Sequence, residues 1–199
     1  MAGRPREFDR EAALIAARNL FWRHGYEGTS MADLVAEMGI ASARIYHAFG
    51  SKEQLFREAV GNYADNEGGF AVAALQQANI LAAVSALFSA AIALYTRNIQ
   101  PLGCMVVSAA GGLSEDNDSL REWLAQQRQQ RTQGIIDRFI QAAAQGELAA
   151  EADPLRLGHF YATFLHGLSV QARDGVSPQA LTDAATLALW PLQNSLRRD

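Results

Sequence analysis

The stretch TSMADLVAEMGIASARIYHAFGSKEQLF, from Thr29 to Phe56, contains two short amphipathic segments separated by Gly39. Apolar residues of the first segment recur at the i, i+3, i+4, i+7 spacing of one helical face: Met31, Leu34, Val35 and Met38. Ser30 and Asp33 form the capping-box pattern that begins a helix, and glycine permits the sharp turn that ends one. We therefore predict a short helix that begins after Ser30 and ends at Gly39.

The second segment, Ala41 to Phe49, has only a narrow apolar stripe, formed by Ile45 and Phe49. Most of its surface is not needed for packing, and four side chains are expected to face outward: Ser42, Arg44, Tyr46 and His47. A short helix, a glycine turn and a second helix with exposed polar groups indicate a helix-turn-helix, whose second helix enters a major groove. Arg44 is the candidate for base reading because arginine pairs bidentately with guanine, whereas Ser42 and His47 suit either bases or phosphates.

Further cations flank this motif on both sides. Ser51 and Gln54 repeat the capping pattern directly after it, and Lys52 lies beside the exposed amides of the next helix, which together suit a phosphate. Near the N-terminus, Arg4 and Arg6 are expected to form an arm that reaches into a minor groove. The alternative is an ordinary solvated terminus.

The same stretch resembles the N-terminal DNA-binding domain of the tetracycline-repressor-like (TetR/AcrR) family of bacterial transcriptional regulators. The sequence GYEGTSMADLV, residues 25–35, carries the resemblance together with Tyr46, Phe49, Lys52, Glu53, Leu55 and Phe56. The close match covers roughly residues 8–60, and the remainder resembles the family in length and helical character.

The resemblance implies DNA-phosphate contacts for Thr29 and Ser30 and a DNA-backbone contact for Tyr46. Capping alone is the alternative for Ser30. Ala48 departs from the pattern because many members have histidine there, so no contact is expected from its side chain.

Composition places the chain among packed, all-α proteins. Of the 199 residues 49% are hydrophobic and only 5 are proline, which argues against disorder, and β-branched runs are scarce. We expect an N-terminal three-helix helix-turn-helix domain at residues 1–57 and a C-terminal helical ligand-binding and dimerisation domain at residues 58–199. The longest apolar region, residues 71–94, is interrupted by Gln, Asn and Ser, so we expect no membrane span. The N-terminal sequence MAGRPREFDR lacks an apolar signal core, so we expect a cytoplasmic protein.

The charge is unevenly divided between the two halves. The net charge is −4, but residues 1–57 hold 8 Lys+Arg against 7 Asp+Glu, which is +1, and residues 58–199 are therefore at −5. Affinity for double-stranded DNA would thus depend on a few well-placed cations rather than on a broadly basic surface.

Two C-terminal helices are predicted at about residues 154–174 and 178–196, because Asp153-Pro154 and Ser177-Pro178 each place a capping side chain before a proline. They carry more apolar surface than a small domain can bury, which indicates a homodimer interface. In the resembled family such a helix pair forms a four-helix bundle across a two-fold axis. The helix after Lys52 would connect this part of the chain with the DNA-binding domain.

Release from DNA by a small, largely apolar effector is expected to involve the interior of the C-terminal domain. The candidate ligand-binding residues are Phe88, Tyr95, Cys104, Trp123, Phe139 and Phe164. Each of them has an ordinary core position as its alternative. The run QQRQQR, residues 126–131, is predicted to be a solvated helix face.

Other functions remain open from the sequence. Cys104, the single cysteine, is the candidate switch of a redox or electrophile sensor, although its sequence neighbours include no cation to favour the thiolate. His159 and His166 share a helical face, yet no short-range Cys/His cluster supports a metal site, so we predict no metal and no cofactor. An all-α enzyme or ligand carrier with a structural helix-turn-helix is the alternative from another class, but we find no catalytic constellation.

Overall fold

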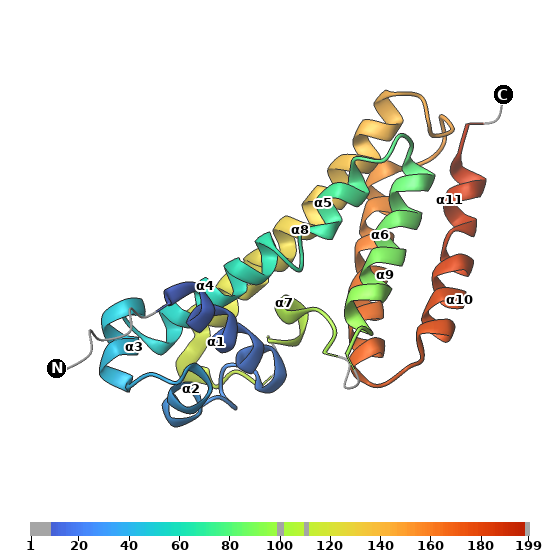
Figure 1. Cartoon of the computed structure of the whole chain (residues 1–199). Coiled ribbons are helices and arrows are strands. Elements are labelled where there is room, and N and C mark those ends of the chain that lie inside the picture. Colours follow the sequence, from blue (N-terminus) through green and yellow to red (C-terminus); the bar gives the residue numbers. More distant parts are fainter. Residues whose placement is uncertain (1–8, 99–101, 110–111, 198–199) are drawn as a thin grey trace.

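The chain is described by a computed structural model that covers residues 9–98, 102–109 and 112–197. These residues form helices and connecting turns without a strand, so the predicted all-α class is confirmed. One end of the molecule holds the three N-terminal helices, and the other end holds a helical bundle (Figure 1). No helix in the described ranges is long and apolar enough to span a lipid bilayer.

The N-terminal helices are α1 (Arg10–His24), α2 (Met31–Met38) and α3 (Ser42–Phe49). The carboxylate of Asp9 caps α1 by accepting from the amides of Glu11 and Ala12. Ser30 and Asp33 form the predicted reciprocal capping box of α2. Gly39 adopts a φ of 66° directly after α2, a conformation that favours glycine and turns the chain toward α3.

The core of this end contains a cluster of aromatic residues. The ring of Phe21 in α1 lies 5.1 Å from that of Phe56 at right angles, and Tyr26 contacts Phe56 at 5.2 Å. Leu34 and Ile45 extend the same buried cluster into α2 and α3. The three helices are thereby fixed relative to one another.

Helix α4 (Lys52–Asp65) begins beside α3 and runs toward the bundle (Figure 1). It packs along α1, and its buried residue Tyr63 contacts the ring of Trp22 at 4.8 Å. A single continuous helix therefore extends from the helix-turn-helix to the C-terminal half.

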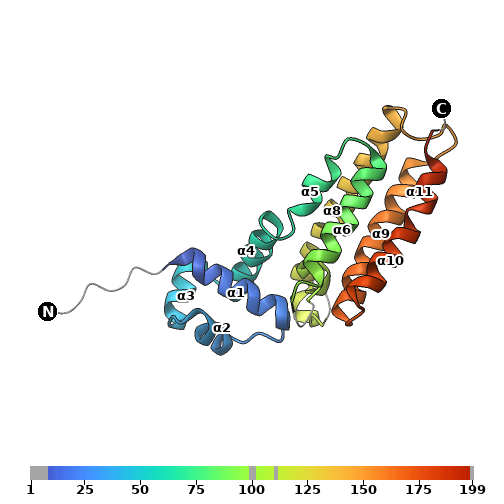
Figure 2. The ribbon, with the colours of Figure 1, turned by 45° about the vertical axis from the view of Figure 1, so that its right-hand side comes forward.

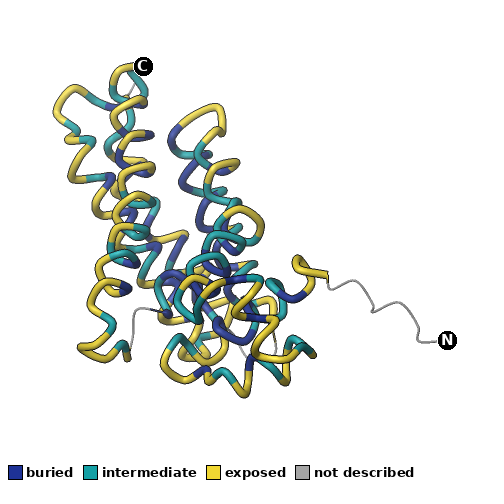
Figure 3. The backbone as a smooth tube through the Cα atoms, turned by 90° about the vertical axis from the view of Figure 1, so that its left-hand side faces the viewer, coloured by how far each residue is buried: buried dark blue, intermediate teal, exposed yellow. Residues whose placement is uncertain are grey.

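The remaining elements are α5 (Phe70–Leu75), α6 (Ile80–Tyr95), α7 (Met105–Ser108), the 3₁₀ turn η1 (Glu115–Asn117), α8 (Asp118–Ala144), α9 (Pro154–Arg173), α10 (Pro178–Ala188) and α11 (Trp190–Ser195). Figure 2 shows α6, α8, α9 and the α10–α11 pair running side by side. Buried residues lie where these helices face one another, and the outer faces are exposed (Figure 3). The close contact of α8 with α9 depends on Gly158, where an added Cβ would lie 2.8 Å from the Cα of Ile136.

The prediction of a single helix at residues 178–196 is wrong in one respect, because the segment is interrupted between α10 and α11. Pro191 has no N–H to donate to the carbonyl of Leu187, so one helical hydrogen bond is missing at this point. The hydroxyl of Tyr161 lies in the gap, donating to the Ala188 carbonyl at 2.8 Å and accepting from the Leu192 amide at 3.1 Å. Tyr161 thus replaces the direct helical bond between these two groups.

Candidate nucleic-acid interface and ligand cavity

Helix α3 is held by one face and leaves the other to solvent. Ile45 and Phe49 are buried. The side chains predicted to face outward are all exposed: Ser42, Arg44, Tyr46 and His47. Within the described ranges, no hydrogen bond or ion pair involves any of these four side chains. Their donors and acceptors are free for an external partner.

Arg10 adds a further set of contacts to α3, which sequence reasoning missed. Its guanidinium donates to the Ala48 carbonyl at 3.2 Å, lies 4.4 Å from the ring centroid of Phe49 and pairs with Glu58 at 2.7 Å. Arg10 therefore links the C-terminal end of α3 to α1 and α4. No local signal could have revealed this contact, since 38 residues separate Arg10 from Ala48.

Thr29 and Ser30 differ in their availability to DNA. Thr29 has no exposed surface, and its hydroxyl donates to the Gly25 carbonyl at 2.7 Å. The phosphate contact implied by family resemblance is therefore not available to the Thr29 side chain. Ser30 is exposed at the start of α2, although its hydroxyl also donates to Asp33 at 2.6 Å.

Lys52 is the first residue of α4, and Ser51 caps that helix by accepting from the Gln54 amide at 3.0 Å. The ammonium of Lys52 lies 4.3 Å from the ring centroid of Tyr26. Partial burial lowers the pKa of Lys52, while the nearby carboxylate of Glu27 acts in the opposite direction. The helix N-terminus and a positioned cation thus lie together, as a phosphate site requires. The predicted arm residues Arg4 and Arg6 lie outside the described residues.

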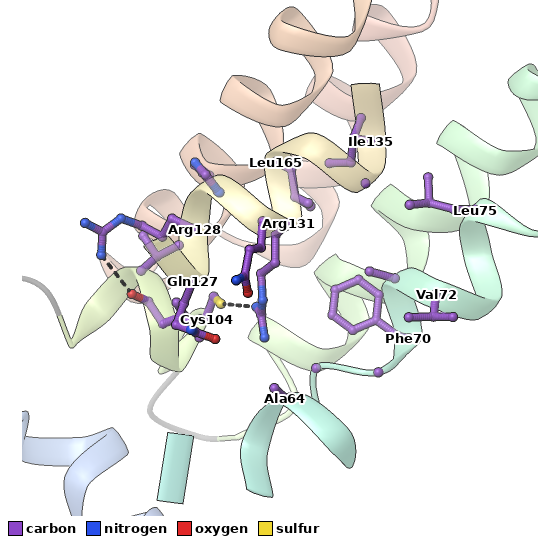
Figure 4. A pocket seen from close by; sticks show the side chains of 18 of the residues that line it. Ala64, Phe70, Val72, Leu75, Cys104, Gln127, Arg128, Arg131, Ile135 and Leu165 are labelled. Carbon is purple, nitrogen blue, oxygen red and sulfur yellow. Dashed lines mark hydrogen bonds between the residues drawn. The ribbon is translucent and has the colours of Figure 1, made fainter. Parts of the chain in front are cut away.

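A cavity of about 320 Å³ lies in the C-terminal half, at the end of α4 and among α5, α7, α8 and α9. Two of the six predicted ligand-binding residues, Tyr95 and Cys104, line it. Figure 4 shows the cavity with α5 on one side and the polar side chains of α8 on the other. Apolar residues that the sequence did not single out complete the wall: Phe70, Val72, Leu75, Ile135 and Leu165.

The other four predicted ligand residues do not line this cavity. Phe139 stacks on Tyr161 at 5.3 Å, and Phe88 contacts Phe164 at 5.0 Å, so these rings form part of the bundle core. The guanidinium of Arg57 lies over Trp123, 4.8 Å from the centroid of the Trp123 ring. Aromatic content alone did not distinguish core rings from cavity rings.

The prediction of a solvated face for residues 126–131 is wrong for part of the run. Arg128 and Arg131 are partly buried and line the cavity with Gln127 and Gln130. Arg131 donates to the sulfur of Cys104 at 3.2 Å (Figure 4). Tertiary structure thus supplies the cation that the sequence neighbours of Cys104 lack.

His166 also lines the cavity, whereas His159, the other histidine of α9, is exposed. Burial lowers the pKa of His166, and the nearby charges of Arg128 and Arg131 lower it further. Across the described part of the chain, no cluster of His, Cys, Asp and Glu residues could hold a metal ion.

Comparison with known proteins agrees with this architecture. Residues 13–59 match the family model "Bacterial regulatory proteins, tetR family", and residues 81–188 match "Tetracyclin repressor-like, C-terminal domain". The HTH-type transcriptional repressor ComR of Escherichia coli (strain K12) is 34% identical over 95% of this chain and 92% of its own length. BdcR, an HTH-type transcriptional repressor of the same strain, is 30% identical over 94% of this chain and 90% of its own length.

Among solved structures, the TetR family transcriptional regulator CifR is 39% identical to this chain, with a TM-score of 0.89. The match covers 94% of this chain and 100% of CifR, which was solved as a cysteine mutant complexed with 26 bp double-strand operator DNA.

Proposed function

Because this chain belongs to the TetR family of bacterial regulatory proteins, which are DNA-binding transcriptional regulators, we propose that it is a repressor that binds operator DNA as a homodimer. Residues 1–57 would bind the DNA, and residues 58–199 would bind the effector and the second subunit. The relatives ComR and BdcR are named repressors, and CifR was solved with operator DNA. Such a protein acts in the cytoplasm, where bacterial DNA lies.

The observation that carries the proposal is the exposed face of α3. Arg44, Tyr46 and His47 project from a helix whose buried face is fixed by the N-terminal core, and they have no partner within the described residues. A rigid helix with free polar side chains suits a major groove, in which Arg44 would read a base and its neighbours would bind bases or phosphates. Ser30, Ser42 and Lys52, with the Arg4 and Arg6 arm, would supply further contacts.

Dimerisation is supported by apolar residues that the monomer leaves exposed on its last helices: Leu155, Phe160, Val170, Leu187 and Trp190. Gly167 of α9 has no atom within 4 Å of an added Cβ, so a second helix could approach closely there. Two copies of α3 would then bind successive major grooves about 34–36 Å apart, or a multiple of that distance, in a pseudo-palindromic site.

Effector control would act through α4. Its first residue, Lys52, lies at the DNA-binding end, and residues just after its last turn, Gly68 and Gly69, line the cavity. A ligand that binds one arrangement of α4 more tightly than the other shifts the population toward that arrangement, and a coupling of about 1–3 kcal/mol is typical of such proteins. The enzyme or carrier alternative is not favoured, since the family consists of regulators.

A salt-dependent mobility shift with the DNA upstream of the protein's own gene tests the proposal. Wild type should shift this DNA more tightly than an unrelated sequence. Arg44→Ala should weaken specific binding by about 1–3 kcal/mol, because a bidentate base contact is lost. Arg197→Ala, which removes an exposed arginine beyond α11, is the matched control and should bind as wild type does. Failure of wild type to shift the DNA, or an unaltered shift by Arg44→Ala, would contradict the proposed role of α3.

A further inference from the structure

Two arginines of the cavity wall lack the carboxylate partner that the other shielded arginines have. Across the described ranges, the remaining arginines that are not solvent-exposed each form an ion pair: Arg18 with Glu67, Arg57 with Glu53 and Arg138 with Glu147. Arg128 and Arg131 are partly buried, yet neither has a carboxylate within ion-pair distance among the described residues. The cavity therefore presents two shielded positive charges without a protein counter-charge.

Most hydrogen-bond donors of these arginines are also unused. A guanidinium carries five N–H donors. Arg131 uses one to reach the sulfur of Cys104 at 3.2 Å, and Arg128 has one long bond to the Val106 carbonyl at 3.4 Å. The remaining donors can bind an anion, and guanidinium groups match the planar geometry of a carboxylate.

The neighbouring histidine is consistent with a positive field in this part of the cavity. His166 has its pKa lowered by burial and by the charges of Arg128 and Arg131. A neutral imidazole beside two guanidinium groups still offers one N–H donor to an anion.

The opposite wall of the cavity is apolar. Phe70, Val72 and Leu75 project from α5 on one side, and Ile135 and Leu165 close the interior between α8 and α9 (Figure 4). A polar cationic wall facing an apolar wall suits a molecule with two chemically different ends.

We propose that the effector is an amphipathic carboxylic acid whose carboxylate binds between Arg128 and Arg131 and whose apolar body lies against α5. This inference rests on the proposed function, in which the cavity is the effector site. At roughly 30 Å³ for each water-sized group, the cavity of about 320 Å³ accommodates on the order of ten non-hydrogen atoms. A medium-chain fatty acid or a short arylalkanoic acid has this size.

The same geometry explains how such a ligand would reach α4. The guanidinium of Arg131 lies 5.6 Å from the ring centroid of Tyr63 in α4, and its Nη2 would lie 2.8 Å from a Cβ added to Gly68. A carboxylate in the cavity competes for this guanidinium. Drawing Arg131 away from Tyr63 would change the support of the last turn of α4, and α4 carries Lys52 at its other end.

Calorimetric titration of the purified full-length protein tests the ligand class with two matched pairs: octanoate against octan-1-ol, and 4-phenylbutyrate against 4-phenylbutan-1-ol. At least one acid should bind more tightly than its alcohol by about tenfold or more, which corresponds to about 1.4 kcal/mol. Arg128→Met keeps most of the apolar stem and removes the charge, so it should abolish this preference without weakening the alcohol. Arg197→Met, at an exposed arginine outside the cavity, is the control variant and should retain the preference.

The inference is overturned if neither acid binds more tightly than its alcohol, or if Arg128→Met retains the preference with an unchanged helical circular-dichroism spectrum. A parallel mobility shift with ligand-free wild type separates this failure from failure of the proposed function. DNA binding without a preference for acids would refute only the carboxylate. Preferential acid binding without any DNA shift would refute the regulator and leave an acid-binding cavity.

Discussion

Glu27, in the turn before α2, accepts two hydrogen bonds from Ser114, from its backbone amide at 2.9 Å and from its hydroxyl at 2.7 Å. The same carboxylate oxygen accepts from Asn117 at 2.8 Å. Ser114 and Asn117 lie 87 and 90 positions after Glu27 in the sequence. Their hydrogen bonds thus connect the helix-turn-helix to the start of α8. Since α8 also carries Arg128 and Arg131, this contact gives the cavity a second connection to the DNA-binding end, besides α4.

This contact should depend on pH. Hydrogen bonds from Ser114, the backbone amide first, lower the pKa of Glu27 below its ordinary value of 4.5. A carboxylate whose pKa is lowered in the folded state stabilises the fold at pH values above its ordinary pKa. This stabilisation is lost as the pH falls through the lowered pKa. Glu27→Gln should therefore reduce the free energy of unfolding at neutral pH, by less than about 1 kcal/mol because the carboxylate is exposed. The difference from wild type should shrink in acid.

Urea unfolding of both proteins at a series of pH values measures this difference. Glu115→Gln is the control, because Glu115 lies in the same region but makes no side-chain hydrogen bond within the described residues. A deficit of Glu27→Gln that stays constant from neutral to acid pH would show that the charge of Glu27 plays no part.

Replacement of Lys52 should change the salt dependence of DNA binding. If its ammonium neutralises one phosphate in each subunit, Lys52→Ala reduces the slope of log K against log salt by about 0.9 per contact, or about twice that for a dimer. Lys52→Arg keeps the charge and should retain most of the slope. Mobility shifts at several salt concentrations measure both variants, and equal slopes for Lys52→Ala and wild type would exclude the phosphate contact.

Local sequence patterns predicted the elements that local chemistry determines. The capping pairs at Ser30 and Asp33, the glycine turn and the exposed face of α3 depend on residues within a few positions of one another. These patterns also located the starts of α9 and α10, because an aspartate or serine before a proline is a complete signal by itself.

The cavity was harder to predict because it depends on contacts between distant elements. Arg131 meets Cys104 across 27 residues, so a run of Gln and Arg that looks solvated by composition instead forms part of an interior wall. Phe139 and Tyr95 are both aromatic residues of helical segments, yet Phe139 stacks inside the bundle and Tyr95 lines the cavity. Only the packing of α5, α7, α8 and α9 distinguishes these two environments.

Introducing a charge on the last helices should separate the proposed subunits. Trp190 is 62% exposed in the monomer, next to Leu187 at 58%. If Trp190 is central to the interface, Trp190→Glu should weaken dimerisation by about 2 kcal/mol or more, roughly 30-fold in the dissociation constant. Light scattering at micromolar concentrations measures the mass. Val72→Glu, at an equally exposed apolar residue of α5, should remain dimeric, and a monomeric wild type would contradict the interface altogether.

Removal of the Tyr161 hydroxyl, which lies at the break between α10 and α11, should destabilise the fold. Tyr161→Phe keeps the ring but leaves the Ala188 carbonyl and the Leu192 amide without their shared partner. Because unpaired buried polar groups cost about 1–3 kcal/mol, the free energy of unfolding should fall by that amount. Tyr46→Phe removes the hydroxyl of an exposed tyrosine and should leave stability unchanged. A loss for Tyr161→Phe no larger than that for Tyr46→Phe would show that water replaces the hydroxyl.

Two glycine-to-alanine substitutions should have opposite effects on stability. Alanine is favoured over glycine in a helix interior by about 0.5–1 kcal/mol. An added Cβ at Gly61 of α4 meets no atom within 4 Å, so Gly61→Ala should gain this stabilisation. At Gly158 the Cβ would lie 2.8 Å from the backbone of Ile136, which cannot turn aside, so Gly158→Ala should lose about 1–3 kcal/mol despite the better helix propensity.

Urea unfolding of the two glycine variants measures these changes. If Gly158→Ala is instead as stable as wild type, α8 and α9 must separate readily. Since α8 contributes Arg131 and α9 contributes His166 to the cavity, their walls would then be adjustable. If Gly158→Ala is destabilised, the spacing between α8 and α9 is fixed, and a ligand in the cavity cannot change it. Any structural change on ligand binding would then occur in α4 and α5, which line the other side of the cavity.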